Sequence, residues 1–198
     1  MQKIFNRWSI EGITVSDPGL KNYINLRPII VPTSHGRHAV SQFYKSSHLN
    51  IIERLINHLF VPGHRGKRHR TTSGQCAGKS MTVYNIVKKT LEIIEERTKK
   101  NPIEVFVRAI ENAALREEIT SFQVGRIIVR RAVITAPQRR VDLALRLIKQ
   151  GAYHKAFGKK SITQCLADEI LATYNYDAQN SYAIKEKERI EREAAGAR

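Results

Sequence analysis

Residues 64–80, HRGKRHRTTSGQCAGKS, hold the side chains best suited to chemistry in this sequence. The second half is similar to a phosphate-binding glycine loop, in which four residues separate two glycines and Lys-Ser follows. Here only three residues separate Gly74 from Gly78, and the preceding HRGKRHR is too basic for the buried strand that such a loop leaves. No later segment has the pattern of a parallel strand with a magnesium-binding Asp. A nucleotide hydrolase is therefore the minor alternative.

Metal binding is the second chemistry that these residues could do. His58, His64, His69 and Cys76 fall in one window, but their spacing matches no zinc motif and a second ligand pair is missing. The other cysteine, Cys165, lies far away at a helix-core position, where a thiol acts as a small apolar side chain. Two unpaired cysteines are typical of a reducing cytoplasm. We expect no metal, no cofactor, no catalytic residues and no enzyme activity.

Binding of phosphates fits the same stretch better than either chemistry. Five cations occur with no acidic residue between positions 64 and 79, namely Arg65, Lys67, Arg68, Arg70 and Lys79. A solvated loop is the plain alternative for such a run. The net charge of +16 over 198 residues, however, indicates a polyanionic partner for the whole chain.

Two blocks carry +11 of the net charge of +16. Residues 61–90 hold seven Lys and Arg and no acid, and residues 117–150 hold seven against three. Residues 91–116 and 151–180 are balanced. This distribution indicates a basic surface on a neutral scaffold rather than a basic disordered tail. No apolar run approaches the ~20 residues that span a bilayer, and the N-terminus lacks a signal peptide, so we expect no membrane partner.

A β-hairpin is predicted within the second block, over residues 117–135. Its residues, EEITSFQVGRIIVRRAVIT, are mostly β-branched, and Gly125 marks the turn. Arg126 would lie at the turn, and Arg130 and Arg131 would point to opposite faces of one strand. A ribbon with an arginine on each face suits insertion between two phosphate backbones.

A helix that begins at Pro137 places Arg139 and Arg140 in its first turn. The helix dipole disfavours cations there by about 0.3–1 kcal/mol. An anion held by the free N–H groups and the guanidinium groups would offset that cost. The alternative is an intramolecular ion pair with Asp142 or Glu118.

Helices with aliphatic faces must position these cations. Apolar residues recur at helical spacing from residue 51 to 60 and from 80 to 100, Asn101 caps a helix that begins at Pro102, and Ser161 and Gln164 form a capping box for another. We expect an extended segment over 1–46, a helical domain over 47–180 that carries the basic loop at 61–80 and the hairpin at 117–135, and a charged helix or tail over 181–198. The fold class is mainly α, a single helical bundle with one hairpin.

The type of nucleic acid follows from how the arginines are distributed. A sequence-specific DNA reader needs a recognition helix with basic and amide residues on one exposed face, and no helix here shows one clearly. Arginines on an extended segment, a loop and a hairpin fit folded RNA, which is bound through shape and backbone. A DNA-binding regulator stays the other alternative.

Several segments resemble one family in the same order along the chain. NPIEVFVRAIENAALREE (101–118), APQRRVDLAL (136–145), KSITQCLADEILA (160–172) and NSYAIKEKERIER (180–192) resemble the S-seven family of small-subunit ribosomal proteins. YINLRPIIVPTSHGRHA (23–39) is similar to the extension of its archaeal and eukaryotic branch. The likeness runs from about residue 20 to the end.

The resemblance implies a protruding hairpin and a cytoplasmic protein that binds the 3′ major domain of small-subunit rRNA and nucleates assembly of the subunit head. It also implies a place near the exit-site tRNA and the mRNA exit channel, beside the S-eleven protein, and no homo-oligomer. The family's RNA contacts would fall on the arm through Lys79, the hairpin, and Arg139 and Arg140. Arg126 departs from the family's frequent Gly-Gly tip, and the arm is longer than in bacterial members.

Overall fold

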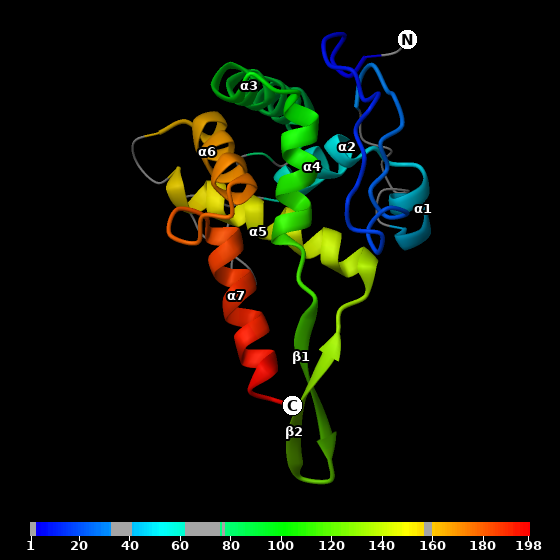
Figure 1. Cartoon of the computed structure of the whole chain (residues 1–198), viewed down its shortest axis with the longest axis vertical. Coiled ribbons are helices and arrows are strands. Elements are labelled where there is room, and N and C mark those ends of the chain that lie inside the picture. The colour runs from blue at the N-terminus through cyan, green and yellow to red at the C-terminus, as the bar shows by residue number, and fades with distance from the viewer. Residues whose placement is uncertain (1–2, 33–40, 62–75, 77, 157–159) are drawn as a thin grey trace.

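Seven helices and one antiparallel hairpin make up the described part of the chain (Figure 1). The structure, a computed structural model, describes residues 3–32, 41–61, 76, 78–156 and 160–198. In chain order the elements are α1 (Gln42–Ser47), α2 (Ile51–Leu59), α3 (Ser80–Thr98), α4 (Pro102–Ala113), β1 (Glu117–Val124), β2 (Ile127–Ile134), α5 (Pro137–Lys155), α6 (Ile162–Tyr174) and α7 (Tyr182–Ala195). The predicted class, mainly α with one hairpin, is confirmed. None of these described helices is long and apolar enough to cross a lipid bilayer.

Side-chain caps fix the start of four helices. Asn50, Asn101, Ser161 and Ser181 each accept a hydrogen bond from a backbone N–H of the first turn, at 2.9, 3.1, 3.4 and 3.2 Å. A cap satisfies a donor that the helix itself leaves free and contributes about 1 kcal/mol. The predicted caps at Asn101 and Ser161 are confirmed, so α4 and α6 begin where the sequence indicates.

An aliphatic core holds the bundle together. Helix α4 packs against α3, α5 and α6, and its Ile103, Phe106 and Ile110 have no exposed surface. Cys165 of α6 is also fully buried, which agrees with its predicted role as a small apolar side chain. Burial of one large aliphatic side chain contributes about 1.5–3 kcal/mol. The buried faces of the helices therefore supply stability that the exposed cations do not.

One carboxylate is buried where α5, α6 and α7 meet. The Glu169 side chain has no exposed surface and forms an ion pair with Lys155 at 2.7 Å. Its Oε1 accepts hydrogen bonds from the Ser181 hydroxyl and the Ala183 N–H, both at 3.0 Å. Gly151 allows α5 to approach this carboxylate, because a Cβ there would lie 2.5 Å from the Glu169 carboxyl carbon. Three helices are thus joined at one buried charge.

Residues 3–32 run over the bundle without forming a helix. Ile4, Trp8 and Leu20 from this segment are buried in the same core as the helices. A single β-bridge between Ile4 and Trp8 is its most regular feature. The sequence did not predict α1, because six residues are too few to establish a helical period.

Strands β1 and β2 form a ribbon that extends away from the bundle (Figure 1). The antiparallel register runs from Glu117 at the base to Val124 at the tip, in agreement with the hairpin predicted over residues 117–135. Helix α7 runs alongside the base, where Arg198 pairs with Glu117. Only β1 and β2 form a sheet in the described residues, so no further strand supports the outer half of the ribbon.

Candidate nucleic-acid interface

The sequence predicts RNA contacts at ten cations, and the structure describes six of them. The other four, Arg65, Lys67, Arg68 and Arg70, lie outside the described residues, and their contacts stay predictions. Lys79 is exposed and directly precedes the first residue of α3. The remaining five lie in the hairpin and in the first turn of α5, which follows β2 after a connection of two residues, Thr135 and Ala136.

Arg130 and Arg131 lie on opposite faces of the ribbon. They are neighbours in β2, paired with Ser121 and Thr120 of β1, and successive residues of a strand point to opposite sides. Both side chains are exposed. Within the part of the chain that the structure describes, neither forms an ion pair with a carboxylate. Their charges are therefore available to an external anion on both sides of the ribbon.

Large apolar side chains accompany the arginines on each face. Phe122 and Val129 share the face of Arg131 and are 44% and 38% exposed. Ile128 shares the face of Arg130 and is 69% exposed. Grouped exposed apolar side chains mark contact surfaces in soluble proteins. The ribbon thus offers charge and apolar area together, as a surface does that contacts both phosphates and bases.

Arg126 lies at the tip of the hairpin, where it forms the turn together with Gly125. Gly125 has a φ of +62°, whereas Arg126 does not adopt a positive φ. A glycine with positive φ at the first central position is the arrangement of a type II′ turn, which suits the twist of a hairpin. The second position accepts a residue with a side chain, so Arg126 in place of a second glycine causes no strain.

Arg139 pairs with Glu118 across the base of the hairpin. Its Nε and a terminal nitrogen donate to the two carboxylate oxygens at 2.6 and 2.8 Å. This pair is one of the two intramolecular alternatives that the sequence left open. The Arg139 side chain nevertheless stays 50% exposed, so part of the guanidinium group still faces solvent. Its predicted contact with RNA stays a prediction.

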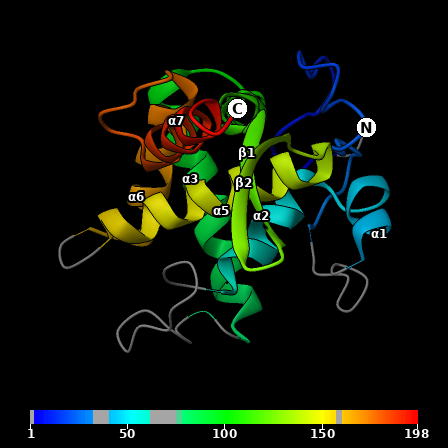
Figure 2. The ribbon, with the colours of Figure 1, turned by 90° about the horizontal axis from the view of Figure 1, so that it is seen from below.

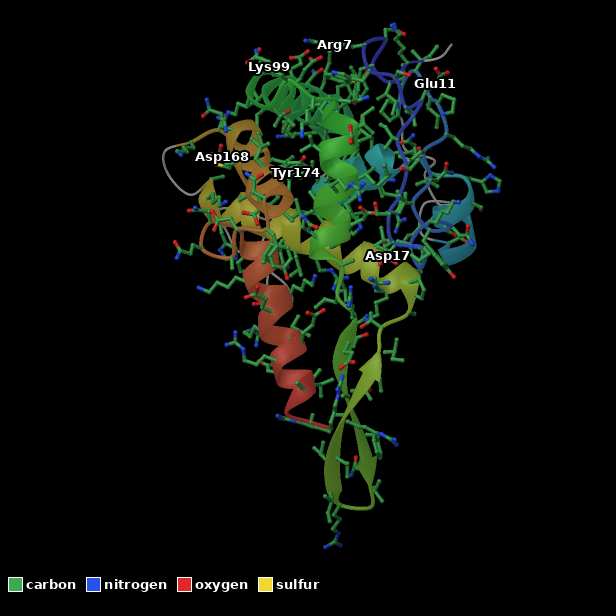
Figure 3. The ribbon with its side chains drawn as sticks, viewed as in Figure 1. Arg7, Glu11, Asp17, Lys99, Asp168 and Tyr174 are labelled. Carbon is green, nitrogen blue, oxygen red and sulfur yellow. The ribbon has the colours of Figure 1, made fainter. Side chains whose placement is uncertain are left out.

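Arg140 is engaged more deeply than Arg139. It donates to Asp17 at 2.7 Å and to the carbonyl of Leu115 at 2.9 Å, and its side chain is 12% exposed. Burial acts to raise the pKa of Asp17, but the hydrogen bond from Arg140 holds that pKa below its ordinary value. Figure 3 shows Asp17 beside the start of α5. A carboxylate of this chain thus occupies the guanidinium group that the sequence assigned to an external anion.

A hollow of about 690 Å³ at the hairpin base contains cations that sequence reasoning missed. Arg108 and Arg116 line it, and Arg108 pairs with Glu111 at 2.9 Å. Arg116 is exposed, and its side chain pairs with no carboxylate among the residues described. Both arginines occur singly in the charge-balanced segment 91–116, so no charge run marked them. We add Arg116 to the candidate interface.

Comparison with known proteins agrees with the architecture and the charge distribution. The family model described as ribosomal protein S7p/S5e matches residues 20–198. The chain is 50% identical over 197 residues to the small ribosomal subunit protein uS7 of Nanoarchaeum equitans, a match that covers 99% of this chain and 98% of the relative. It is 46% identical to the uS7 protein of Archaeoglobus fulgidus, over 98% of this chain and 94% of the relative. The chain therefore belongs to the ribosomal protein S7p/S5e family.

Proposed function

We propose that this chain binds small-subunit rRNA directly, through the hairpin and the cations around its base. As a member of its family it is a structural component of the small ribosomal subunit, and it works in the cytoplasm within the ribosome. The observation that supports direct RNA binding is a ribbon whose Arg126, Arg130 and Arg131 meet no carboxylate in the described part of the protein. Cations left unpaired on a projecting element have little value for the stability of the bundle.

The mechanism of binding is electrostatic. Each arginine or lysine that neutralises an rRNA phosphate releases a condensed counterion, and this release supplies much of the binding free energy. The bundle contributes by holding the ribbon in a fixed direction relative to α5, since the Arg139–Glu118 pair joins the two elements at the hairpin base. A cation in a fixed position loses less conformational entropy on binding than one on a mobile chain.

The finer placement of the protein rests on its family resemblance. We propose that the bound rRNA is the 3′ major domain, and that early binding there allows the head of the subunit to assemble around this chain. The same resemblance supports a position near the exit-site tRNA and the mRNA exit channel, beside the S-eleven protein. A projecting ribbon suits such a position, because it extends from the bundle with little of its own surface buried (Figure 1).

The salt dependence of RNA binding tests the proposal. We expect the affinity of the whole chain for a 3′ major domain transcript to fall by about 10³–10⁵ between roughly 50 and 200 mM salt, as it does when about 6–10 phosphates are neutralised. Filter binding or fluorescence titration measures this slope. A flat response, or equal competition by duplex DNA, would contradict the proposal and favour the DNA-binding alternative.

A phosphate-release assay addresses the remaining alternative, nucleotide hydrolysis. Gly78 and Lys79 directly precede α3, and the only strands described, β1 and β2, are antiparallel and lie later in the chain. A phosphate loop instead follows a strand of a parallel sheet. We expect no release of phosphate from ATP or GTP. Turnover that disappears in Lys79→Ala would overturn the structural role.

A further inference from the structure

A cavity of about 350 Å³ lies between α2 and α5, with α1 at its edge. The described residues that line it include four cations, Lys45, Arg54, Arg146 and Lys149, and a single carboxylate, Asp142. Figure 2 shows α2 and α5 next to each other behind the hairpin, and the two helices are in contact. The volume exceeds that of ten waters at about 30 Å³ each. The cavity thus combines room for a small group with an excess of positive charge.

Asp142 cannot balance these charges. It already contacts Arg54 at 3.0 Å, Lys45 at 3.6 Å and the imidazole of His58 at 3.7 Å. Burial acts to raise the pKa of Asp142, but the nearby His58 imidazole and the charge of Arg54 hold that pKa well below its ordinary value. Asp142 is therefore ionised at neutral pH, but its single negative charge balances only one of the four cations.

Donors without partners point to a missing acceptor. The Arg54 side chain is 2% exposed, and its Nε–H finds no acceptor among the described residues. The buried Nδ2 of Asn57, which also lines the cavity, has none either. An unsatisfied buried donor costs about 1–3 kcal/mol, so such groups normally meet a protein acceptor, a water or a ligand.

Lys149 and Arg146 show where the excess charge lies. Lys149 is buried and donates to the carbonyl of Val61 at 2.8 Å. Burial, and then repulsion from Arg146, lower its pKa to about 8. The Arg146 side chain forms no ion pair within the part of the chain described. A bound anion would satisfy both side chains at once.

We propose that this cavity binds one phosphodiester group of the rRNA backbone. The inference rests on the proposed function and adds a contact to it, remote from the hairpin. Arg146 favours phosphate, since its planar guanidinium group matches the phosphate oxygens with paired hydrogen bonds. Arg54 adds its unpartnered Nε–H, because its terminal nitrogens already donate to Tyr23 and Asp142. Arg146 lies ~13 Å along the axis of α5 from Pro137, where the chain leaves the hairpin, so one RNA surface can reach both places.

Replacement of Arg146 tests this contact. Arg146→Gln removes one unpaired cation without removing any hydrogen bond described above, so we expect an unchanged midpoint of thermal unfolding. The plot of log affinity for the 3′ major domain transcript against log salt should lose about one unit of slope, and affinity near 0.1 M salt should fall about five- to tenfold. Arg146→Lys keeps the charge and should restore most of the slope.

Arg192→Gln is the matched control, because Arg192 is an exposed arginine of α7 whose side chain also lacks an ion pair in the described residues. If Arg146→Gln and Arg192→Gln bind RNA like the unmodified protein, the cavity does not hold a phosphate, and a partner protein with acidic residues becomes its better occupant. If the unmodified protein itself fails to bind the transcript, the proposed function fails as well. The two failures are thus distinguished in one titration series.

Discussion

Two sets of charged side chains differ in what surrounds them. Arg130 and Arg131 on the hairpin face Ser121 and Thr120, and meet no carboxylate in the described residues. Arg140, only nine residues after Arg131, is largely buried against a carboxylate of the N-terminal segment. The sequence presents all three as members of one basic block. The difference teaches that charge density predicts a polyanionic partner, whereas only the local environment tells which cations are available to it.

The positions of the acidic residues in the hairpin explain which cations are paired and which are not. Glu117 and Glu118 lie at the base of β1, where Arg198 and Arg139 bind them. Beyond the base the ribbon carries arginines and no acid. Ion pairs thus fix the base to α5 and to Arg198, which follows α7, while the outer half stays cationic. We call the unpaired cations of the ribbon, Arg126, Arg130 and Arg131, the hairpin set, and the charged side chains held by partners within the bundle, such as Arg140 and Glu169, the bundle set.

The bundle set contains the most sensitive residue, Glu169. Glu169→Ala removes the acceptor of the Ser181 hydroxyl and the Ala183 N–H and leaves a cavity, so we expect the free energy of unfolding to fall by about 3–5 kcal/mol. Urea unfolding measures this loss. Glu193→Ala is the matched control, because Glu193 is 50% exposed and pairs only at the surface, where ~1 kcal/mol or less is at stake. Equal losses in both variants would show that burial does not separate the two sets.

The hairpin set should affect RNA binding and not stability. For the double variant Arg130→Ala, Arg131→Ala we expect affinity near 0.1 M salt to fall about 60-fold, or about 2.4 kcal/mol, because each neutralised phosphate contributes roughly eightfold between 1 and 0.1 M salt. The slope against log salt should decrease by about two units. The far-ultraviolet circular dichroism and the unfolding midpoint should stay constant. Unfolding of this variant would place both arginines in the bundle set.

Arg140 is the opposite case, because we expect its replacement to affect stability and not RNA binding. Arg140→Ala removes hydrogen bonds to the Asp17 carboxylate and the Leu115 carbonyl, so we expect a loss of about 1.5–3 kcal/mol in stability. Folded Arg140→Ala protein should bind RNA with the unmodified salt slope. A slope reduced by about one unit, without loss of stability, would instead support the RNA contact that the sequence predicts for Arg140.

Arg139 should have the smallest effect on stability. Its pair with Glu118 is half exposed, and such pairs contribute about 1 kcal/mol or less. Arg139→Ala should therefore shift the midpoint of urea unfolding only slightly. The slope of log affinity for RNA against log salt shows to which set Arg139 belongs. A decrease of about one unit in Arg139→Ala assigns Arg139 to the hairpin set, and an unchanged slope assigns it to the bundle set.

The sequence predicted those features that local chemistry determines. Asn101 and Pro137 mark helix starts, Gly125 marks the turn, and the pair between Arg139 and Glu118 was one of two local alternatives. Contacts between distant segments could not be predicted, because no local pattern encodes them. The bond between Asp17 and Arg140 joins residues 123 positions apart.

The cavity between α2 and α5 escaped prediction for the same reason. Lys45, Arg54, Arg146 and Lys149 come from three separate helices, and none lies in a run of basic residues. Helix periodicity predicts that α2 and α5 each have a buried face, but it does not tell which faces meet. A polar site assembled from single residues becomes visible only once the helices are packed.

The projecting ribbon makes the protein prone to aggregation before it binds RNA. Within the described residues, β1 and β2 are both edge strands with unpaired backbone groups, and Ile127, Ile128 and Phe122 expose apolar surface beside those edges. Such edges invite strand addition by another copy and lead to aggregation. Arg126, Arg130 and Arg131 interrupt this apolar run with like charges that repel a second ribbon, which is the gatekeeper role of charged residues in β-structure. The same guanidinium groups would then keep newly synthesised chains soluble until RNA covers the ribbon.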